Sequence, residues 1–472
     1  MSDELWTWDA ADLAAGIRER RISAREAAES ALARVETVNR SVNAVVEVRP
    51  DEVIQAAESA DRAVAAGEPL GPLHGVPVTS KVNSDLIGYA TTDGVEAFAG
   101  AIATTDAPQL ANWRRAGAVF LGRTNTPAFS IRWFTDNVLH GRTYNPWAAG
   151  RTPGGSSGGA AAAVATGMGA LAQGNDIGGS VRYPAAACGV VGLRPTVGRV
   201  PSLFGPPGGD VMLGVQLMLV QGLLGRSVAD VRLGLEAMAA YDPTDPLCVP
   251  APLRGAALPG PIRVGLVRDV GVVGNAPAVD AALTEAASRL TDAGYAVGEV
   301  ELPLLADAWR LWWQLVQGVE FLHMLPAIEE HGDPGIRRSA ETQFAFVRNT
   351  FGDVGFDDYV RGHARRSTLV RQLQAALQTT PVLLTPVSAE RTFEIDADVR
   401  TDERTAEVIT AQWPMMSVAC LGAPGLTVPV QLDDGLPISV QLVGGRFRED
   451  TLLDAGAAIE RRGLVPTPVD PR

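Results

Sequence analysis

Residues 154–163 read GGSSGGAAAA, in which two serines stand between two glycine pairs and a run of alanines follows. The stretch has three interpretations: a flexible linker, a phosphate-binding loop, or part of a catalytic site. A phosphate-binding loop carries Lys and then Ser or Thr after its last glycine, whereas alanine follows Gly159. Residues 160–165 favour a helix, which is not how a flexible linker ends. The remaining interpretation is a glycine-rich turn that leads into a helix, with Ser156 and Ser157 just before the helix begins.

A second glycine-rich stretch, GNDIGGSVRYP, occupies residues 174–184. In it, Ser180 directly follows Ile177, Gly178 and Gly179. Glycines let the backbone adopt positive φ and turn several successive N–H groups toward one point. A serine hydroxyl beside such donors suits acyl transfer, because the hydroxyl attacks a carbonyl carbon while the N–H groups stabilise the oxyanion.

A serine nucleophile needs a base. The chain has five histidines, none in a recognisable triad context, and it lacks the G-x-S-x-G elbow. A lysine held neutral by burial is the alternative base. Lys81 closes the apolar run HGVPVTSK and is the only lysine among 40 basic residues. A solvated surface charge can be either lysine or arginine, so a single lysine near a strand end points to a special role.

Taken together, HGVPVTSK, GGSSGG and GNDIGGSVRYPAAACGVVGLRPTVGRV resemble the amidase signature family of serine hydrolases. LLGRSVADV, VLLTPV, APGLTVPV and GLPISVQLVG extend the resemblance over nearly the whole chain. The resemblance implies a hydrolase that cleaves a carboxylic amide C–N bond to acid and amine through a covalent acyl-Ser180 intermediate. It implies no metal and no organic cofactor.

The resemblance also assigns roles to residues. Its catalytic residues are the nucleophile Ser180, the base Lys81 and the proton relay Ser156, whose peptide bond is cis in the family. Its oxyanion hole consists of the N–H groups of Ile177, Gly178 and Gly179, to which Ser180 itself can add. Its supporting residues are Ser157, Asp176 and Arg182.

Two positions depart from the family pattern. Val82 stands where the family lysine is commonly followed by Asp, and Asn175 stands where the family often has Ser or Thr. We expect both to change how the surroundings of the triad are hydrogen-bonded, with the triad itself unchanged.

Several aromatic residues are candidates for the substrate pocket, namely Phe129, Trp133, Phe134, Tyr183 and Trp313. Core packing is the simpler interpretation of each. If they line the pocket, they favour an apolar or aryl amide as the substrate.

Other activities remain open. The same triad serves an ester, carbamate (urethane) or aryl-acylamide hydrolase. The glutaminase subunit of a tRNA-dependent amidotransferase is disfavoured, because an aromatic pocket suits the charged head of glutamine poorly. A non-catalytic binding protein is disfavoured by the presence of all three triad residues.

The chain has 472 residues, 46% of them hydrophobic, and a formal net charge of −14. Its basic residues are scattered, which disfavours nucleic acid or an anionic membrane as a partner. The three cysteines are far apart, and neither a signal peptide nor a bilayer-spanning run is visible. We therefore expect a cytoplasmic enzyme acting on a small-molecule amide or related acyl substrate, and a homodimer is left open.

Ala-rich helical segments alternate with short Val- and Leu-rich strands, which predicts an α/β sheet covered on both faces. The resemblance adds that this is a single large α/β/α sandwich with a mixed central sheet. The predicted strands are 76–82, 118–122, 262–267, 382–385, 426–430 and 438–443. Helices are predicted within 13–35, with a capping box at Ser23 and Glu26, and within 53–66 and 309–351.

One domain is expected over residues 1–472. It comprises N-terminal helices (1–66), a catalytic core (about 67–235), a helical excursion that covers the substrate (about 300–410), and C-terminal strands with a helix (about 420–465).

Overall fold

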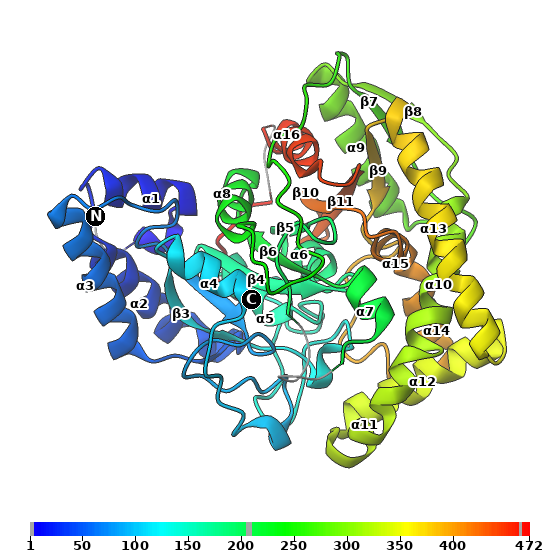
Figure 1. Cartoon of the computed structure of the whole chain (residues 1–472), viewed down its shortest axis with the longest axis horizontal. Coiled ribbons are helices and arrows are strands. Elements are labelled where there is room, and N and C mark those ends of the chain that lie inside the picture. The colour runs from blue at the N-terminus through cyan, green and yellow to red at the C-terminus, as the bar shows by residue number, and fades with distance from the viewer. Residues whose placement is uncertain (1–3, 204–209, 462–464) are drawn as a thin grey trace.

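The computed structural model describes residues 4–203, 210–461 and 465–472. Within these residues one eleven-stranded sheet runs through the molecule, and helices lie on both of its sides (Figure 1). From one edge to the other, the strands are β1 (Val45–Glu47), β3 (Val119–Thr124), β2 (Pro77–Lys81), β4 (Leu171–Asp176), β6 (Val220–Gly225), β5 (Val191–Arg194), β10 (Gly425–Asp433), β11 (Leu436–Gly444), β9 (Val382–Pro386), β7 (Arg263–Leu266) and β8 (Ala296–Glu299).

The sheet is mixed, as expected. Strands β3, β2 and β4 are parallel to one another, as are β9, β7 and β8 at the other end. The strands between them pair antiparallel, from β4 through β6, β5, β10 and β11 to β9. Each of the six predicted strands overlaps a strand of the structure, whereas β1, β4, β5, β6 and β8 were not predicted.

Two layers of helices cover the sheet, which confirms the α/β/α expectation. Val382 and Leu384 of β9 pack into one hydrophobic cluster, and Leu383 between them packs into another on the opposite face. The first face carries α1 (Ala10–Arg18), α2 (Ala24–Val42), α3 (Pro50–Ala66), α4 (Pro108–Arg115), α8 (Val228–Met238), α9 (Pro277–Asp292) and α16 (Glu449–Glu460). The second carries α5 (Gly158–Ala165), α6 (Arg182–Cys188), α10 (Leu304–Trp312), α13 (Phe356–Thr379), α14 (Asp402–Ala411) and α15 (Trp413–Cys420).

The predicted capping box starts α2. The Ser23 hydroxyl accepts a hydrogen bond from the Glu26 N–H at 3.0 Å, and the Glu26 carboxylate accepts one from the Ser23 N–H at 2.7 Å. Such a cap contributes roughly 1 kcal/mol to the stability of a helix.

The predicted helical segment 309–351 is helical but interrupted. Helix α10 leads into a π-helical turn (Trp313–Gln317) and a 3₁₀ turn (Glu320–Met324), which are followed by α11 (Leu325–His331) and α12 (Pro334–Phe351). These elements and α13 lie along the right side of Figure 1, away from the N-terminal helices. Whether this region covers the substrate stays a prediction.

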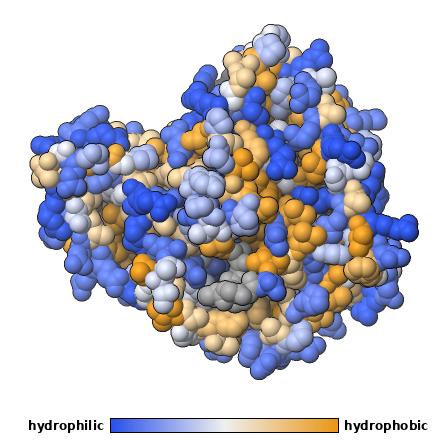
Figure 2. Space-filling view, viewed as in Figure 1, coloured by the Kyte–Doolittle hydropathy of each residue, from blue (hydrophilic) through white to orange (hydrophobic). Residues whose placement is uncertain are grey.

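The molecular surface is mixed in polarity. On the face shown in Figure 2, hydrophilic residues dominate the rim and apolar residues gather nearer the centre. Exposed apolar side chains include Leu203 and Leu213, the second at the start of α7 (Leu213–Met218). In the part of the chain that the structure describes, no helix combines the length and the apolar character needed to cross a bilayer.

Candidate active site

The parallel pairing of β2 and β4 brings Lys81, at the end of HGVPVTSK, close to the stretch GNDIGGSVRYP. Val78 of β2 pairs with Leu171 of β4, so that both strands end at the same edge of the sheet. Lys81 is the last residue of β2, and Asn175 and Asp176 are the last two of β4. The serines of GGSSGG immediately precede α5, which leads into β4.

Lys81 is fully buried between neutral partners. Its Nζ lies 2.7 Å from Ser156 Oγ and 2.9 Å from Asn175 Oδ1, both within hydrogen-bonding distance. Burial lowers the pKa of Lys81 to about 7, although the negative charges of Asp93 and Asp176 act in the opposite direction. A substantial fraction of the amine is therefore neutral, and able to accept a proton, near neutral pH.

The two serine loops lie against each other. The Ser157 N–H donates to the Ser180 carbonyl at 3.1 Å, and the peptide bond between Gly155 and Ser156 is cis, as the resemblance implies. Ser156 is 1% exposed and Ser180 7%. Among the described residues the Ser180 hydroxyl takes part in no hydrogen bond, so it has not formed the expected bond to Ser156 in this structure.

Ser157 supports this arrangement through its backbone. Its side-chain hydroxyl is buried and has no hydrogen-bond partner among the described residues. The contribution that the structure gives it is the N–H donated to the Ser180 carbonyl, together with its place as the N-cap residue of α5.

In the loop that follows β4, the backbone N–H groups differ in whether they donate a hydrogen bond. Gly179 has φ of +102°, a backbone conformation that glycine adopts easily, and its N–H donates to Asp176 Oδ1 at 2.9 Å. Within the described residues, the N–H groups of Ile177, Gly178 and Ser180 donate no hydrogen bond. The groups left for an oxyanion are thus those of Ile177, Gly178 and Ser180, whereas that of Gly179 is occupied.

A buried ion pair holds this loop at its base. Arg182 donates to both oxygens of Asp176, at 2.8 and 3.0 Å, and all of these groups are fully buried. Arg194 donates to the Asp176 backbone carbonyl at 2.5 Å. Burial is the largest single effect on the pKa of Asp176 and would raise it, but the charges of Arg182 and Arg194, together with the hydrogen bonds that the carboxylate accepts, outweigh burial and hold that pKa below its ordinary value. Asp176 and Arg182 therefore hold the loop that contains Ser180, and their supporting role in catalysis stays a prediction.

Asn175, one of the two departures from the family pattern, forms hydrogen bonds with Lys81 and Asn83. Its Oδ1 lies beside Lys81 Nζ, and its Nδ2 donates to Asn83 Oδ1 at 2.9 Å. Asn83 Nδ2 in turn donates to Ser130 Oγ at 3.0 Å, and Ser130 Oγ donates to Asp93 Oδ1 at 2.5 Å. Asn83, Ser130 and Asp93 were not identified from the sequence; the signal available was the position of Asn83, two residues after the single lysine.

The candidate pocket aromatics fall into two groups. Trp133, Phe134, Tyr183 and Trp313 share one hydrophobic cluster, whereas Phe129 belongs to a second cluster with Ile328 and Ile336. The rings of Trp133 and Trp313 pack edge to face, with their centroids 6.2 Å apart. Of the first group, Trp133 lies next to the loop after β4, because its Nε1 donates to the Gly178 carbonyl at 3.0 Å.

A cavity of about 490 Å³ lies elsewhere, in the helical region. Its lining includes Leu322, Ile328, Phe344 and Val347, and none of Lys81, Ser156 and Ser180.

Cys188 is a buried thiol in α6, eight residues after Ser180. Its Sγ donates to the Pro153 carbonyl at 3.4 Å, and burial raises its pKa well above the usual range. A raised pKa keeps the thiol protonated, so it packs as a small apolar group and not as a second nucleophile. The described residues also hold no group of three or more His, Cys, Asp or Glu side chains placed to bind a metal ion.

Comparison with known proteins extends over most of the chain. A family model described as Amidase matches residues 26–453. The chain is 42% identical to an indoleacetamide hydrolase from Bradyrhizobium diazoefficiens, over 98% of this chain and 87% of that protein. It is 33% identical to a glutamyl-tRNA(Gln) amidotransferase subunit from Acidothermus cellulolyticus, over 96% and 93% of the two chains. Among solved structures, a bacterial aryl acylamidase of the amidase signature family superimposes with a TM-score of 0.82, at 26% identity and over 96% of each chain.

Proposed function

The chain belongs to the amidase family and hydrolyses amide C–N bonds, and from this premise we propose that Ser180 is its nucleophile, Ser156 its proton relay and Lys81 its base. The observation that carries the proposal is the 2.7 Å contact between Ser156 Oγ and the fully buried Lys81 Nζ. A buried amine without an ion-pair partner favours its neutral form, and only that form can accept a proton.

The reaction begins with attack of Ser180 Oγ on the amide carbonyl carbon. The proton of Ser180 passes to Ser156 Oγ while the proton of Ser156 passes to Lys81 Nζ. The negative charge that develops on the carbonyl oxygen is met by the unoccupied N–H groups of the loop after β4. Collapse of this intermediate breaks the C–N bond, and the amine leaves with a proton returned along the same path. Water then attacks the acyl-Ser180 ester and releases the acid.

We assign the substrate to small amides with an aryl or indole group, such as arylacetamides. Two observations support this class: the 42% identity to a protein named indoleacetamide hydrolase, and the indole rings of Trp133 and Trp312, which touch the loop after β4. Esters, urethanes and aryl acylamides are the alternative substrates, because acylation of Ser180 is common to all of them.

The proposal is tested with a matched substrate panel on the purified chain: indole-3-acetamide, acetanilide, phenyl acetate, a phenyl urethane and glutamine. We expect the highest kcat/KM for indole-3-acetamide. The substitution Ser180→Ala should lower kcat by about 10³-fold or more, since removal of a nucleophile abolishes the covalent route. The control Ser59→Ala, an exposed serine on α3, should leave kcat unchanged.

Two results would overturn the proposal. Full turnover by Ser180→Ala would show that Ser180 is not the nucleophile. Glutamine hydrolysis above that of every aryl amide, dependent on an added second protein chain, would instead favour the glutaminase alternative suggested by the amidotransferase relative. A cytoplasmic location and a homodimer remain predictions from the sequence.

A further inference from the structure

Two tryptophans hold the carbonyl groups of the loop after β4. Trp312 Nε1 donates to the Ile177 carbonyl at 2.8 Å, and Trp133 Nε1 donates to the Gly178 carbonyl at 3.0 Å. Trp312 ends α10, and Trp133 lies in the segment after a 3₁₀ turn (Ala128–Ser130), so the two donors reach the loop from separate parts of the chain.

A held carbonyl also orients an N–H group. In a planar trans peptide the C=O of one residue and the N–H of the next point in opposite directions. Trp312 therefore turns the Gly178 N–H away from itself, and this N–H has no partner among the described residues. The next peptide group is held at both ends, because its carbonyl accepts from Trp133 and its N–H, that of Gly179, donates to Asp176.

The third peptide group of the loop follows the same pattern. The Gly179 carbonyl accepts from the Tyr183 N–H at 2.8 Å, and within the described residues the Ser180 N–H is left unoccupied. Three successive peptide planes are thus each held by a named donor, and the N–H groups of Gly178 and Ser180 are left facing away from those donors.

We propose that Trp312 and Trp133 are positioning residues that hold the Ile177–Gly178 and Gly178–Gly179 peptide groups in the orientation that presents the Gly178 N–H to the oxyanion. This inference rests on the proposed function, because it takes the attack of Ser180 on an acyl carbon as given. Neither tryptophan needs to touch the reacting atoms for this role.

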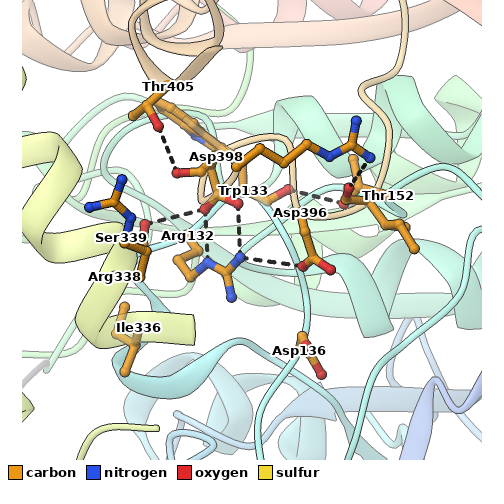
Figure 3. A network of polar contacts seen from close by, with 12 residues as sticks. Arg132, Trp133, Asp136, Thr152, Ile336, Arg338, Ser339, Asp396, Asp398 and Thr405 are labelled. Carbon is orange, nitrogen blue, oxygen red and sulfur yellow. Dashed lines mark hydrogen bonds and ion pairs between the residues drawn. The ribbon is translucent and has the colours of Figure 1, made fainter. Parts of the chain in front are cut away.

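The backbone around Trp133 is itself held firmly. Arg132, the preceding residue, makes two hydrogen bonds of 2.8 Å to Asp398, and both side chains are buried (Figure 3). Thr152 Oγ1 donates to the Trp133 carbonyl at 3.2 Å. A Cβ atom added at Gly155 would lie 2.7 Å from the Trp133 carbonyl carbon, so the same segment packs directly against the residue before Ser156.

The ring of Trp312 is fixed by close packing. It meets the ring of Trp313 edge to face at 5.1 Å, and a Cβ atom added at Gly178 would lie 3.1 Å from Trp312 Cζ2. The indole is thus in contact with the loop through its ring as well as through its N–H.

Trp309 provides a matched control on the same helix. It is also buried, in the same hydrophobic cluster as Trp312, and its Nε1 has no hydrogen-bond partner among the described residues. Replacing Trp309 by Phe therefore removes a comparable ring area, together with an indole N–H that donates no hydrogen bond to any described residue.

The test compares Trp312→Phe, Trp133→Phe and Trp309→Phe with the unmodified chain. It measures kcat and KM for indole-3-acetamide, the rate constant of Ser180 labelling by a fluorophosphonate, and Tm. Direct loss of an oxyanion donor costs about 10²–10³-fold in kcat, so we expect a loss of about 10–100-fold for an indirect effect. We expect KM to stay within about threefold, labelling to slow in parallel with kcat, and Trp309→Phe to keep kcat within about twofold.

A second replacement separates the N–H from the ring. Benzothienylalanine at position 312 keeps the shape of the indole and replaces its N–H by sulfur, so it should lower kcat as Trp312→Phe does, with Tm near that of the unmodified chain. The inference is overturned if this variant keeps full kcat, or if Trp309→Phe loses as much as the other two Phe variants. Failure of the proposed function is a different result: the unmodified chain would then show no label on Ser180.

Discussion

Lys81 has two neutral hydrogen-bond partners and, among the described residues, no ion-pair partner. A buried ammonium in that setting would be costly, whereas the neutral amine is satisfied. Because Asn175 Oδ1 can only accept, it takes one N–H of the amine. The nitrogen lone pair is then free to face Ser156, which is the arrangement that a base requires.

The pH dependence of the reaction follows from this burial. Protonated Lys81 cannot accept a proton, and burial lowers its pKa to about 7. We therefore expect kcat/KM for indole-3-acetamide to fall as the pH drops below about 7 and to level off above about 8. A pH–rate series on the purified chain checks this. A rate that is constant from pH 5 to 9, or that rises only above pH 10, would argue against Lys81 as the base.

Gly155 meets a strict steric requirement at the start of the serine loop. A Cβ atom there would overlap the Arg132 carbonyl oxygen and lie 2.7 Å from the Phe134 nitrogen, and backbone atoms cannot move aside cheaply. We expect Gly155→Ala to lower the free energy of unfolding by about 3 kcal/mol or more, as measured by urea titration. In Gly150→Ala, where the new atom has no neighbour within 4 Å, the change should stay below about 1 kcal/mol. Equal stability of the two variants would contradict the packing described.

Strand β4 shows why part of the site escaped prediction. Its sequence, LAQGND, lacks a run of Val and Leu such as the one in β9, which reads VLLTP. Its polar side chains are nevertheless buried, because Gln173 accepts from the Lys81 N–H and Asn175 and Asp176 hold Lys81 and Arg182. Because the side chains of β4 form hydrogen bonds at the site, they are polar. The strand therefore lacks the apolar pattern from which strands are predicted.

The serines, the lysine and the residues adjacent to them in the motifs could be selected from the sequence, but their partners from distant segments could not. Lys81, Ser156 and Ser180 stand in distinctive local sequence, which is independent of the fold. Trp312 lies 135 residues from Ile177, and no local pattern indicates that its indole reaches that carbonyl. The same holds for Asp93, whose contact with the lysine network passes through Ser130.

The Arg132–Asp398 pair ties the segment carrying Trp133 to the residues before α14 (Figure 3). Removing one partner of a buried ion pair leaves the other charge uncompensated, at a cost of about 3–5 kcal/mol. We expect Asp398→Asn to lower the free energy of unfolding by about this amount in urea titrations. The exposed Asp434→Asn, next to Arg391, should change it by less than about 0.5 kcal/mol. A stability unchanged by Asp398→Asn would show that the pair does not anchor the segment.

The single sheet links all parts of the described chain, from β1 near the N-terminal helices to β8. If residues 1–472 form one domain, as the sequence predicts, heat should unfold the chain in one transition, with calorimetric and van't Hoff enthalpies that agree. Differential scanning calorimetry at several scan rates measures this. Two separated transitions, one of which leaves the region around α10–α13 folded, would divide the chain into two units.

The central claim is that the hydroxyl of Ser180 forms the acyl-enzyme while Ser156 passes the proton. It is tested most directly by labelling the chain with a fluorophosphonate and locating the adduct by peptide mass spectrometry. The account predicts one adduct, on Ser180, with labelling at pH 8 slowed by about 10²-fold or more in Lys81→Ala. An adduct on Ser156, or labelling that Lys81→Ala leaves unchanged, would contradict it.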